Sequence, residues 1–204
     1  EERTVLEGIK HLIIGGGAID DGLANELKHF PNNVWSTYGM TETLSHIALR
    51  RLNGDNASDW YTPFDQVHIR LSEEGTLVIH APEVCAEELT TNDIAEINEK
   101  GEFRILGRKD NVINSGGIKI QIEQVEALLK PHLSTPFLIT STSDAKFGEA
   151  VVLLYEKGNE EELQALCKAA LPPYWMPKRF VQVEALPLTE TGKPNRPAAR
   201  ILAR

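Results

Sequence analysis

The stretch Gly107–Glu126, GRKDNVINSGGIKIQIEQVE, places a charged cluster, a glycine turn and the start of a helix next to one another. An apolar pair precedes Asn-Ser-Gly-Gly and Ile-Lys-Ile follows it, which predicts a hairpin. The segment EQVEALLK then has apolar residues at helical spacing and ends at Pro131, which predicts a helix that stops there. Because the pattern of predicted helices and strands differs on the two sides of Gly107, we expect one domain over residues 1–107 and another over residues 108–204.

The residues that follow carry strand and helix patterns in turn. The segments PFLITSTS and EAVVLLYEK read as strands joined by DAKFG, and RFVQVEAL reads as a further strand. NEEELQALCKAAL predicts a helix with Asn159 as its N-cap, glutamates in its first turn and a Pro-Pro pair at its end. An irregular tail containing Pro and Gly is expected after the last strand. Residues 108–204 are thus predicted to form a compact α+β domain.

The residues before the stretch predict a different architecture. HLIIGGG (11–17), DDGLANELKHF (20–30) and NNVWSTYG (32–39) read as strand, helix and strand, which is the pattern at the end of an α/β sheet. TETLSHIALRRL is expected to continue as a turn and mixed structure. The short alternating segments QVHIRL, GTLVIHA and EFRIL, separated by SEEG, TND and NEKG, indicate a small β-barrel or meander. The expected fold is therefore mixed α/β and α+β.

Composition excludes several classes of function. The formal net charge is −9, which disfavours nucleic acid or an anionic membrane surface as the main partner. No apolar run approaches the roughly 20 residues that span a bilayer, and no signal-peptide pattern is present. Cys85 and Cys167 are far apart and are expected to be reduced, buried thiols of a cytoplasmic protein. The six histidines have no ligand spacing, so a zinc site is not expected.

Two further stretches contain residues suited to chemistry. STYGMTET (36–43) offers an aromatic face, a glycine, a hydroxyl and a carboxylate, which suit a base, a phosphate and Mg²⁺. The alternative is a turn at a strand end with a solvated Glu42. LPLTETGKPNR (186–196) contains Lys193, which could act in catalysis or be a solvated lysine in a turn.

The order of five stretches resembles that of the adenylate-forming superfamily, the acyl-CoA synthetases and their relatives. IIGGGAI resembles its glycine-rich strand end, YGMTE its aromatic-Gly-x-Thr-Glu motif, GRKDNVINSGG its domain junction, and PLTETGK its C-terminal lysine motif. LTTNDIAEI (89–97) resembles its Thr-Gly-Asp segment, with Asn92 in place of the usual glycine, and Asn tolerates the positive φ of a turn. The segments YGMTETLSHIALR and GRKDNVINSGGIKIQIEQVE are most similar in sequence to those of the o-succinylbenzoate–CoA ligases of menaquinone synthesis, a family within this superfamily.

This resemblance implies an AMP-forming ligase that uses ATP, Mg²⁺, CoA and a small carboxylic acid. Lys193 would bridge the carboxylate and the α-phosphate, Thr41 would donate to phosphate, and Glu42 would hold Mg²⁺. Tyr38 would stack on adenine. The backbone that lines the base and the phosphates would come from Gly15, Gly16, Gly17 and Gly39.

The resemblance also assigns roles near the junction. Asp93 would accept hydrogen bonds from both ribose hydroxyls, although a loop aspartate that bonds its own backbone is the alternative. Arg108 would reach the same ribose, and Asp110 would be the hinge about which the small domain rotates. Gly116 and Gly117 would leave room for the pantetheine arm of CoA, a role compatible with a simple hairpin turn.

Three alternatives stay open at this point. The superfamily's Ser/Thr/Gly-rich phosphate loop has no counterpart in residues 1–33, so we expect the chain to be the C-terminal part of a longer ligase, inactive by itself. A ligase for a fatty or aryl acid, or a domain that loads a carrier protein, would carry the same motifs. A non-catalytic nucleotide-binding module is the third possibility.

Overall fold

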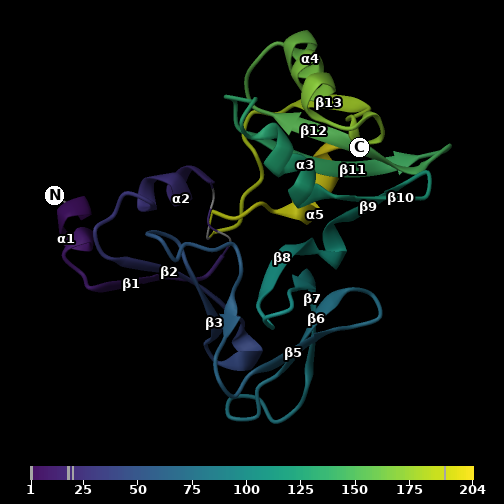
Figure 1. Ribbon diagram of the computed structural model, residues 1–204. Coiled ribbons are helices and arrows are strands. Elements are labelled where there is room, and N and C mark those ends of the chain that lie inside the picture. Colours follow the sequence, from purple (N-terminus) through teal and green to yellow (C-terminus); the bar gives the residue numbers. More distant parts are fainter. Residues whose placement is uncertain (1, 18, 20, 191) are drawn as a thin grey trace. The chain divides into compact units, whose positions relative to one another are not determined.

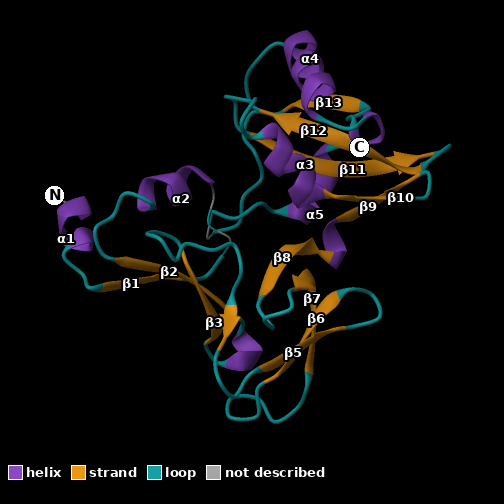
Figure 2. Cartoon of the chain, in the orientation of Figure 1, coloured by secondary structure: helices purple, strands orange, loops and turns teal. Residues whose placement is uncertain are grey.

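The chain divides into two compact units. The computed structural model describes residues 2–17, 19, 21–190 and 192–204 (Figure 1). The first unit is Glu1–Leu106 and the second unit is Gly107–Arg204. Figure 2 shows mixed helix and strand in the second unit.

The first unit begins with a parallel strand pair. Helix α1 (Glu2–Glu7) precedes β1 (His11–Ile14), and α2 (Asp21–Leu27) connects β1 to β2 (Asn33–Gly39). Strands β1 and β2 are parallel, with His11 opposite Asn33. The prediction of an α/β sheet end is confirmed; the predicted start of the helix at Asp20 lies outside the described residues. Leu27, Val34 and Leu52 form the small buried core beneath this segment.

The strand that follows β2 in the chain was not predicted. Residues 46–51, expected as mixed structure, form β3 (His46–Arg51), which pairs antiparallel with β2 and continues the sheet to β4 (Thr62–Pro63). Ile47 and Ala48 are buried in the core that joins this sheet to the next one. The two consecutive arginines after them hid the strand pattern.

The second sheet of this unit is the expected meander. Its order is β5 (His68–Leu71), β6 (Thr76–His80), β7 (Leu89–Ile97) and β8 (Phe103–Arg108). The prediction that TND separates two strands is wrong, because these residues lie inside the nine-residue strand β7. Asn92 therefore stands in a strand and does not have the positive φ expected of a turn residue. Thr90 and Ile94 pair with β6 on either side of Asn-Asp, where the register shifts, so the strand continues through these residues.

The second unit starts with the predicted hairpin. After the 3₁₀ turn Lys109–Asn111, strands β9 (Val112–Ser115) and β10 (Ile118–Gln121) pair antiparallel. Gly116 and Gly117, which join them, have φ of 62° and 84°. Both values lie in the left-handed region that a two-residue hairpin turn requires, so glycine is needed at both positions. Helix α3 (Ile122–Leu129) follows and ends before Pro131, as predicted.

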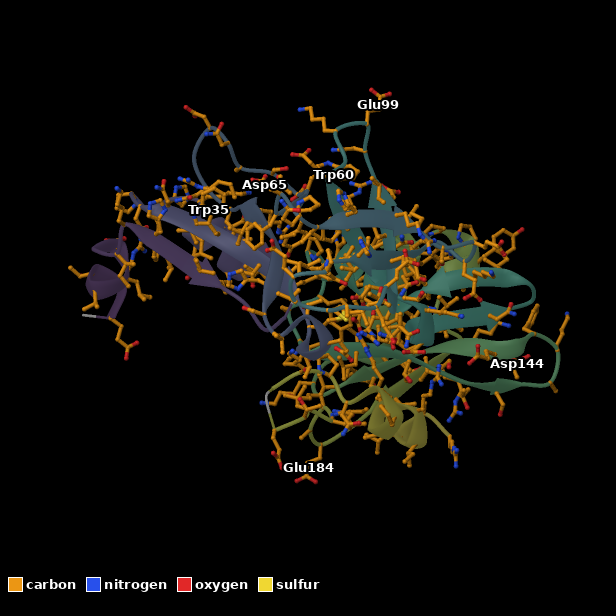
Figure 3. The ribbon with its side chains drawn as sticks, turned by 90° about the horizontal axis from the view of Figure 1, so that it is seen from below. Trp35, Trp60, Asp65, Glu99, Asp144 and Glu184 are labelled. Carbon is orange, nitrogen blue, oxygen red and sulfur yellow. The ribbon has the colours of Figure 1, made fainter. Side chains whose placement is uncertain are left out.

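Three more strands complete the sheet of the second unit. β11 (Phe137–Asp144) and β12 (Gly148–Tyr155) form a long antiparallel pair, and β13 (Arg179–Gln182) lies parallel to β12. Asp144, labelled in Figure 3 at the end of the β11–β12 pair, accepts backbone hydrogen bonds from Lys146 and Phe147 at 2.9 Å each. These two backbone bonds lower the pKa of the Asp144 carboxyl.

Helices cover both faces of this sheet. Val151 and Leu153 of β12 pack with α3 and with α4 (Glu160–Ala170), whereas Val152 and Leu154 pack with Ala199 and Ala203 on the other face. A strand buried on both sides must be apolar at every position, which explains the uninterrupted run AVVLLY. The N-cap prediction for α4 is confirmed, because the Asn159 side chain accepts from the N–H groups of Glu161 and Glu162.

Two further predictions, for the C-terminal tail and for the cysteines, need correction. The expected irregular tail contains α5 (Arg196–Leu202), whose N-cap side chain, Asn195, accepts from the Ala198 N–H. Cys167 is buried as expected, and burial raises the pKa of its thiol from 9.0 to about 11. Cys85 is only half-buried, because it lies in the loop between β6 and β7.

Candidate active site

The first unit brings Tyr38 and Asp93 together. Tyr38 lies near the end of β2 and Asp93 in the middle of β7, 55 residues further along. The Tyr38 hydroxyl donates to Asp93 Oδ2 at 2.6 Å. The Tyr38 ring packs edge-on against Phe103, with centroids 5.1 Å apart. Asp93 lies in a strand and not in a loop, and its carboxylate accepts from a side chain on another strand.

Gly39 permits a close approach of two backbones at the end of β2. A Cβ at this position would lie 2.2 Å from the Ser45 carbonyl oxygen and 2.7 Å from the His46 Cα. The pairing of β2 with β3 also shifts register at Tyr38 and Gly39. Any side chain here would push β3 away, so glycine is required by packing.

A short loop after Gly39 exposes Thr41 and Glu42. Both residues are exposed and belong to the 3₁₀ turn Thr41–Thr43. Thr43 is fully buried; its hydroxyl accepts from the Met40 N–H at 3.1 Å and lies 2.7 Å from the Ser45 carbonyl, which accepts from it. Thr43 therefore holds both ends of the loop and leaves the side chains of its two neighbours at the surface.

Leu44 closes this loop in an unfavourable backbone conformation. Its φ is 59°, the only positive φ at a non-glycine residue in the described part of the chain, and its side chain is 80% exposed. Such conformations cost about 1–3 kcal/mol and concentrate at functional sites. The strain at Leu44 singles out this loop as a candidate site.

The three glycines of the first strand end lie at the surface. Gly15, Gly16 and Gly17 follow β1 directly and are all exposed. Since β1 and β2 are parallel, their carboxyl ends lie at the same edge of the sheet. The glycine turn and the Tyr38–Gly39 strand end are thus neighbours at this edge.

The candidate hinge segment is held to the second unit by side chains of β10 and α3. Asp110 and Arg108 are exposed and form an ion pair at 3.4 Å. The Gln121 amide donates to the Arg108 carbonyl at 3.0 Å, and the Asn111 amide donates to Glu123 at 2.5 Å. Asp110 is thus flanked by one anchored residue on each side.

The Gly116-Gly117 turn packs against the β11–β12 turn. The Gly116 N–H donates to the Phe147 carbonyl at 2.8 Å, and a Cβ on Gly116 would lie 2.9 Å from the Phe147 ring. The Lys178 ammonium sits 3.1 Å from the centroid of that ring. This corner of the second unit therefore presents bare backbone beside an aromatic ring and a cation.

Lys193 lies in a loop of residues 187–195, here called the lysine loop. The Thr189 N–H donates to the Lys193 carbonyl at 2.7 Å, and the Lys193 N–H donates to the Thr189 hydroxyl at 3.1 Å. Leu188 and Pro194 form an antiparallel bridge below them. Thr191, part of the PLTETGK motif, lies outside the described residues. The loop is a small hairpin with the exposed Lys193 near its tip.

The lysine loop and the Gly116-Gly117 turn attach at opposite ends of β12 (Figure 1). Ser115 pairs with Gly148, the first residue of β12, whereas Leu186 at the base of the lysine loop donates to Glu156, just after its last residue. Eight residues at about 3.3 Å each separate these attachments by roughly 26 Å. The two candidate groups of this unit are thus attached far apart on one sheet.

Some residues that shape the site were not predicted, because they act inside a loop or because their partners are distant in the sequence. Thr43 was passed over although a threonine two residues after the candidate hydroxyl could have suggested a turn-capping role. Glu126 and Arg196, which form a bidentate ion pair, are 70 residues apart and carry no pattern that links them.

The candidate ligand for a cation at this site is Glu42. No group of three or more His, Cys, Asp or Glu side chains with metal-binding geometry occurs among the residues described. Glu42 is a single exposed carboxylate. Mg²⁺ suits this arrangement, because it keeps several waters and takes one or two carboxylates together with substrate phosphates.

None of the described helices has the length and apolarity needed to cross a bilayer.

Comparison with known proteins identifies the family. The AMP-binding enzyme C-terminal domain matches residues 140–193. The 2-succinylbenzoate–CoA ligase of Bacillus cereus is 28% identical over 94% of this chain and 46% of its own length. The chain spans about half the length of the curated relatives it matches.

Solved structures give the same result for the fold. An acyl-CoA synthetase (AMP-forming)/AMP-acid ligase II-like protein from Dyadobacter fermentans is 32% identical, with a TM-score of 0.51 over 92% of this chain and 56% of its own. The o-succinylbenzoate CoA synthetase of Bacillus subtilis, solved with the acyl-adenylate OSB-AMP, has a TM-score of 0.77 at 24% identity over 94% of this chain and 46% of its own. The chain belongs to the adenylate-forming (AMP-binding) superfamily and corresponds to the C-terminal half of its members.

Proposed function

We propose that this chain is the C-terminal half of an ATP-dependent acid–CoA ligase. In the first step a substrate carboxylate oxygen attacks the α-phosphorus of ATP, pyrophosphate leaves and an acyl-adenylate forms. In the second step the CoA sulfur attacks the acyl carbon, the bond to AMP breaks and the thiol proton passes to solvent. The relatives at about 25% identity favour o-succinylbenzoate as the acid, and hence a role in menaquinone synthesis.

The observation that carries this proposal is the hydrogen bond between Tyr38 and Asp93. It brings an aromatic ring and a carboxylate side by side at the edge where the glycine turn ends β1. An ionised carboxylate accepts well from paired ribose hydroxyls, and an aromatic face stacks on a base. We assign adenine to Tyr38, the ribose to Asp93 and the backbone contacts to Gly15–Gly17 and Gly39.

The exposed loop after Gly39 suits the phosphates. Thr41 would donate a hydroxyl proton to a phosphate oxygen, and Glu42 would hold Mg²⁺ through its carboxylate. Bound with ATP, Mg²⁺ supplies positive charge that offsets the repulsion between the phosphates and the incoming carboxylate. Because Thr43 fixes the loop from inside, its two exposed neighbours need little reorganisation on binding.

The separation of Lys193 from Gly116-Gly117 supports a swivelling second unit. In this proposal residues 1–107 are part of the large domain and residues 108–204 are the small mobile domain. Two groups whose attachments lie about 26 Å apart along one strand are poorly placed to serve one adenylate together. Rotation about Asp110 would present Lys193 for adenylation and then the glycine turn for the pantetheine arm. The exposed Arg108–Asp110 pair opposes this little, since such pairs are worth about 0–1 kcal/mol.

The test is made in the full-length ligase with a panel of acids. We expect ATP–pyrophosphate exchange with o-succinylbenzoate to exceed that with fatty or benzoic acids, and Asp93→Ala to weaken ATP binding. The loss should be about 10- to 100-fold, since hydrogen bonds to a charged group are worth about 1.5–3 kcal/mol.

Glu96→Gln is the matched control, because Glu96 lies on the same strand and pairs with the surface Arg104. Calorimetry should give the control the ATP affinity of the wild type. Exchange with none of the acids, or equal ATP affinity in Asp93→Ala, would refute the proposal.

A further inference from the structure

The lysine loop is a surface hairpin. Among its described residues, those from 188 to 194 are exposed, so no side chain there is buried in a core. The hydrogen bonds between Thr189 and Lys193 fix the shape of the hairpin. The way in which the loop's two ends are fastened therefore bears on the position of Lys193.

The end that follows Lys193 is fastened by a closed set of polar contacts. Arg196, the first residue of α5, donates from both terminal nitrogens to the two carboxylate oxygens of Glu126 in α3, each at 2.7 Å. Arg196 also donates to the Ile139 carbonyl at 3.0 Å, and Glu126 accepts from the Ile139 N–H at 2.9 Å. One ion pair thus joins α3, β11 and the start of α5.

This set is sheltered from solvent and specific in geometry. The side chains of Arg196 and Glu126 are 19% and 21% exposed. Burial lowers the pKa of Arg196, but the hydrogen bond and charge of Glu126 outweigh it, so the net shift is upward. A planar guanidinium bound to a carboxylate through two bonds fixes orientation as well as distance.

The end that precedes Lys193 has a second carboxylate. Glu156, directly after β12, accepts from the Leu186 N–H at 3.0 Å. Both ends of the lysine loop are therefore bound by acidic side chains that belong to the sheet or to the helix covering it. Only the lysine loop itself lies between these two fastened ends.

We propose that Glu126 and Arg196 are positioning residues that set the place of Lys193 for the adenylation step. This inference rests on the proposed function, because it assigns the pair to the step that Lys193 serves. Misplacement of a reacting group by about 1 Å can cost roughly 100-fold in rate. A pair three residues from Lys193 in sequence and anchored to the rigid sheet is suited to prevent it.

The experiment compares the two half-reactions in variants of the full-length ligase. Arg196→Gln and Glu126→Gln should each lower kcat of ATP–pyrophosphate exchange about 10- to 100-fold with an unchanged KM for ATP. Thioester formation from supplied acyl-adenylate should be retained. The double variant should be no slower than either single one, because each residue acts through the other. Arg196→Lys keeps the positive charge but lacks the planar guanidinium that forms two bonds to Glu126. Its exchange rate should lie between those of the wild type and Arg196→Gln.

Arg179→Gln is the matched control. Arg179 fastens the other end of α5, donating to the carbonyls of Ala203 and Arg204 at 2.9 and 3.2 Å. It should lower the thermal midpoint while leaving the exchange rate of the folded enzyme unchanged. A similar loss of exchange in this control, or a matched decline of both half-reactions in the Arg196 and Glu126 variants, would show a merely structural pair.

Lys193→Ala separates failure of this inference from failure of the proposed function. If Lys193→Ala leaves exchange intact, the assignment of Lys193 itself is wrong and the positioning role falls with it. If Lys193→Ala abolishes exchange while the Glu126 and Arg196 variants behave like Arg179→Gln, only the positioning role is refuted.

Discussion

The two units differ in how completely they bury their sheets. In the second unit α3 and α4 cover one face of the sheet, α5 covers the other, and all of Val151 to Tyr155 is buried. In the first unit the core against which β1 packs has three buried residues among those described, Leu27, Val34 and Leu52. Ile13 in β1 is 51% exposed and Val5 in α1 is 68% exposed.

We propose from this difference that the second unit is an autonomous domain and that the first unit is part of a larger one. Parallel strands are normally covered on both faces, and among the described residues β1 is an edge strand paired with β2. The exposed apolar side chains near β1 would be the surface that further sheet or helix covers. The central strand β12 of the second unit is buried on both faces.

The largest expected effect comes from separating the units. Residues 107–204 alone should give a single cooperative urea transition by circular dichroism, because their core is intact. Residues 1–106 alone should bind the dye ANS and unfold without a sharp transition. Dye binding by both fragments, or by neither, would remove the contrast between them.

A smaller effect is expected from matched truncations in the two units. Leu153→Ala removes a fully buried side chain of β12 and should cost about 2–5 kcal/mol of unfolding free energy. Ile13→Ala in β1 should change it by less than about 0.5 kcal/mol, as exposed positions do. Denaturant titration of the same chain measures both. A large loss for Ile13→Ala would show that β1 is already covered.

The smallest effect concerns the cysteines, one in each unit. Cys85 is half-buried and should react with DTNB at pH 8, whereas Cys167 should react only after unfolding. Burial raises the Cys167 pKa from 9.0 to about 11, so its contribution to stability is complete below pH 9 and is lost as pH rises toward 11. Cys167→Ala should flatten that alkaline decline. Two thiols reacting at equal rates in native protein would contradict the buried assignment.

Local patterns predicted much of the fold. The β9–β10 hairpin followed from Gly116-Gly117, and α4 followed from Asn159 and its acidic first turn. β7 was divided wrongly because Asn92-Asp93 has the composition of a turn, whereas the structure has only a register shift there, within a strand that pairs with β6 on both sides of it. α5 was missed although Asn195 and Pro197 are a cap and a first-turn proline.

The candidate site was predictable only as separate pieces. Resemblance named Tyr38 and Asp93, but nothing in the sequence shows that their side chains meet across 55 residues. The same holds for Arg196 and Glu126, and for the attachment of Lys193 and Gly116 at opposite ends of one strand. Such relations depend on tertiary pairing, which local propensity does not contain.

The central claim is that Lys193 on the second unit serves adenylation and not thioester formation. Single-turnover rates of both half-reactions should be measured in the full-length ligase carrying Lys193→Ala, with Lys168→Ala on the exposed face of α4 as control. The account predicts that adenylate formation falls about 10²–10³-fold, equivalent to about 3–4 kcal/mol, while supplied acyl-adenylate is still converted to thioester. Unchanged adenylation, or an equal loss in both steps, would contradict it.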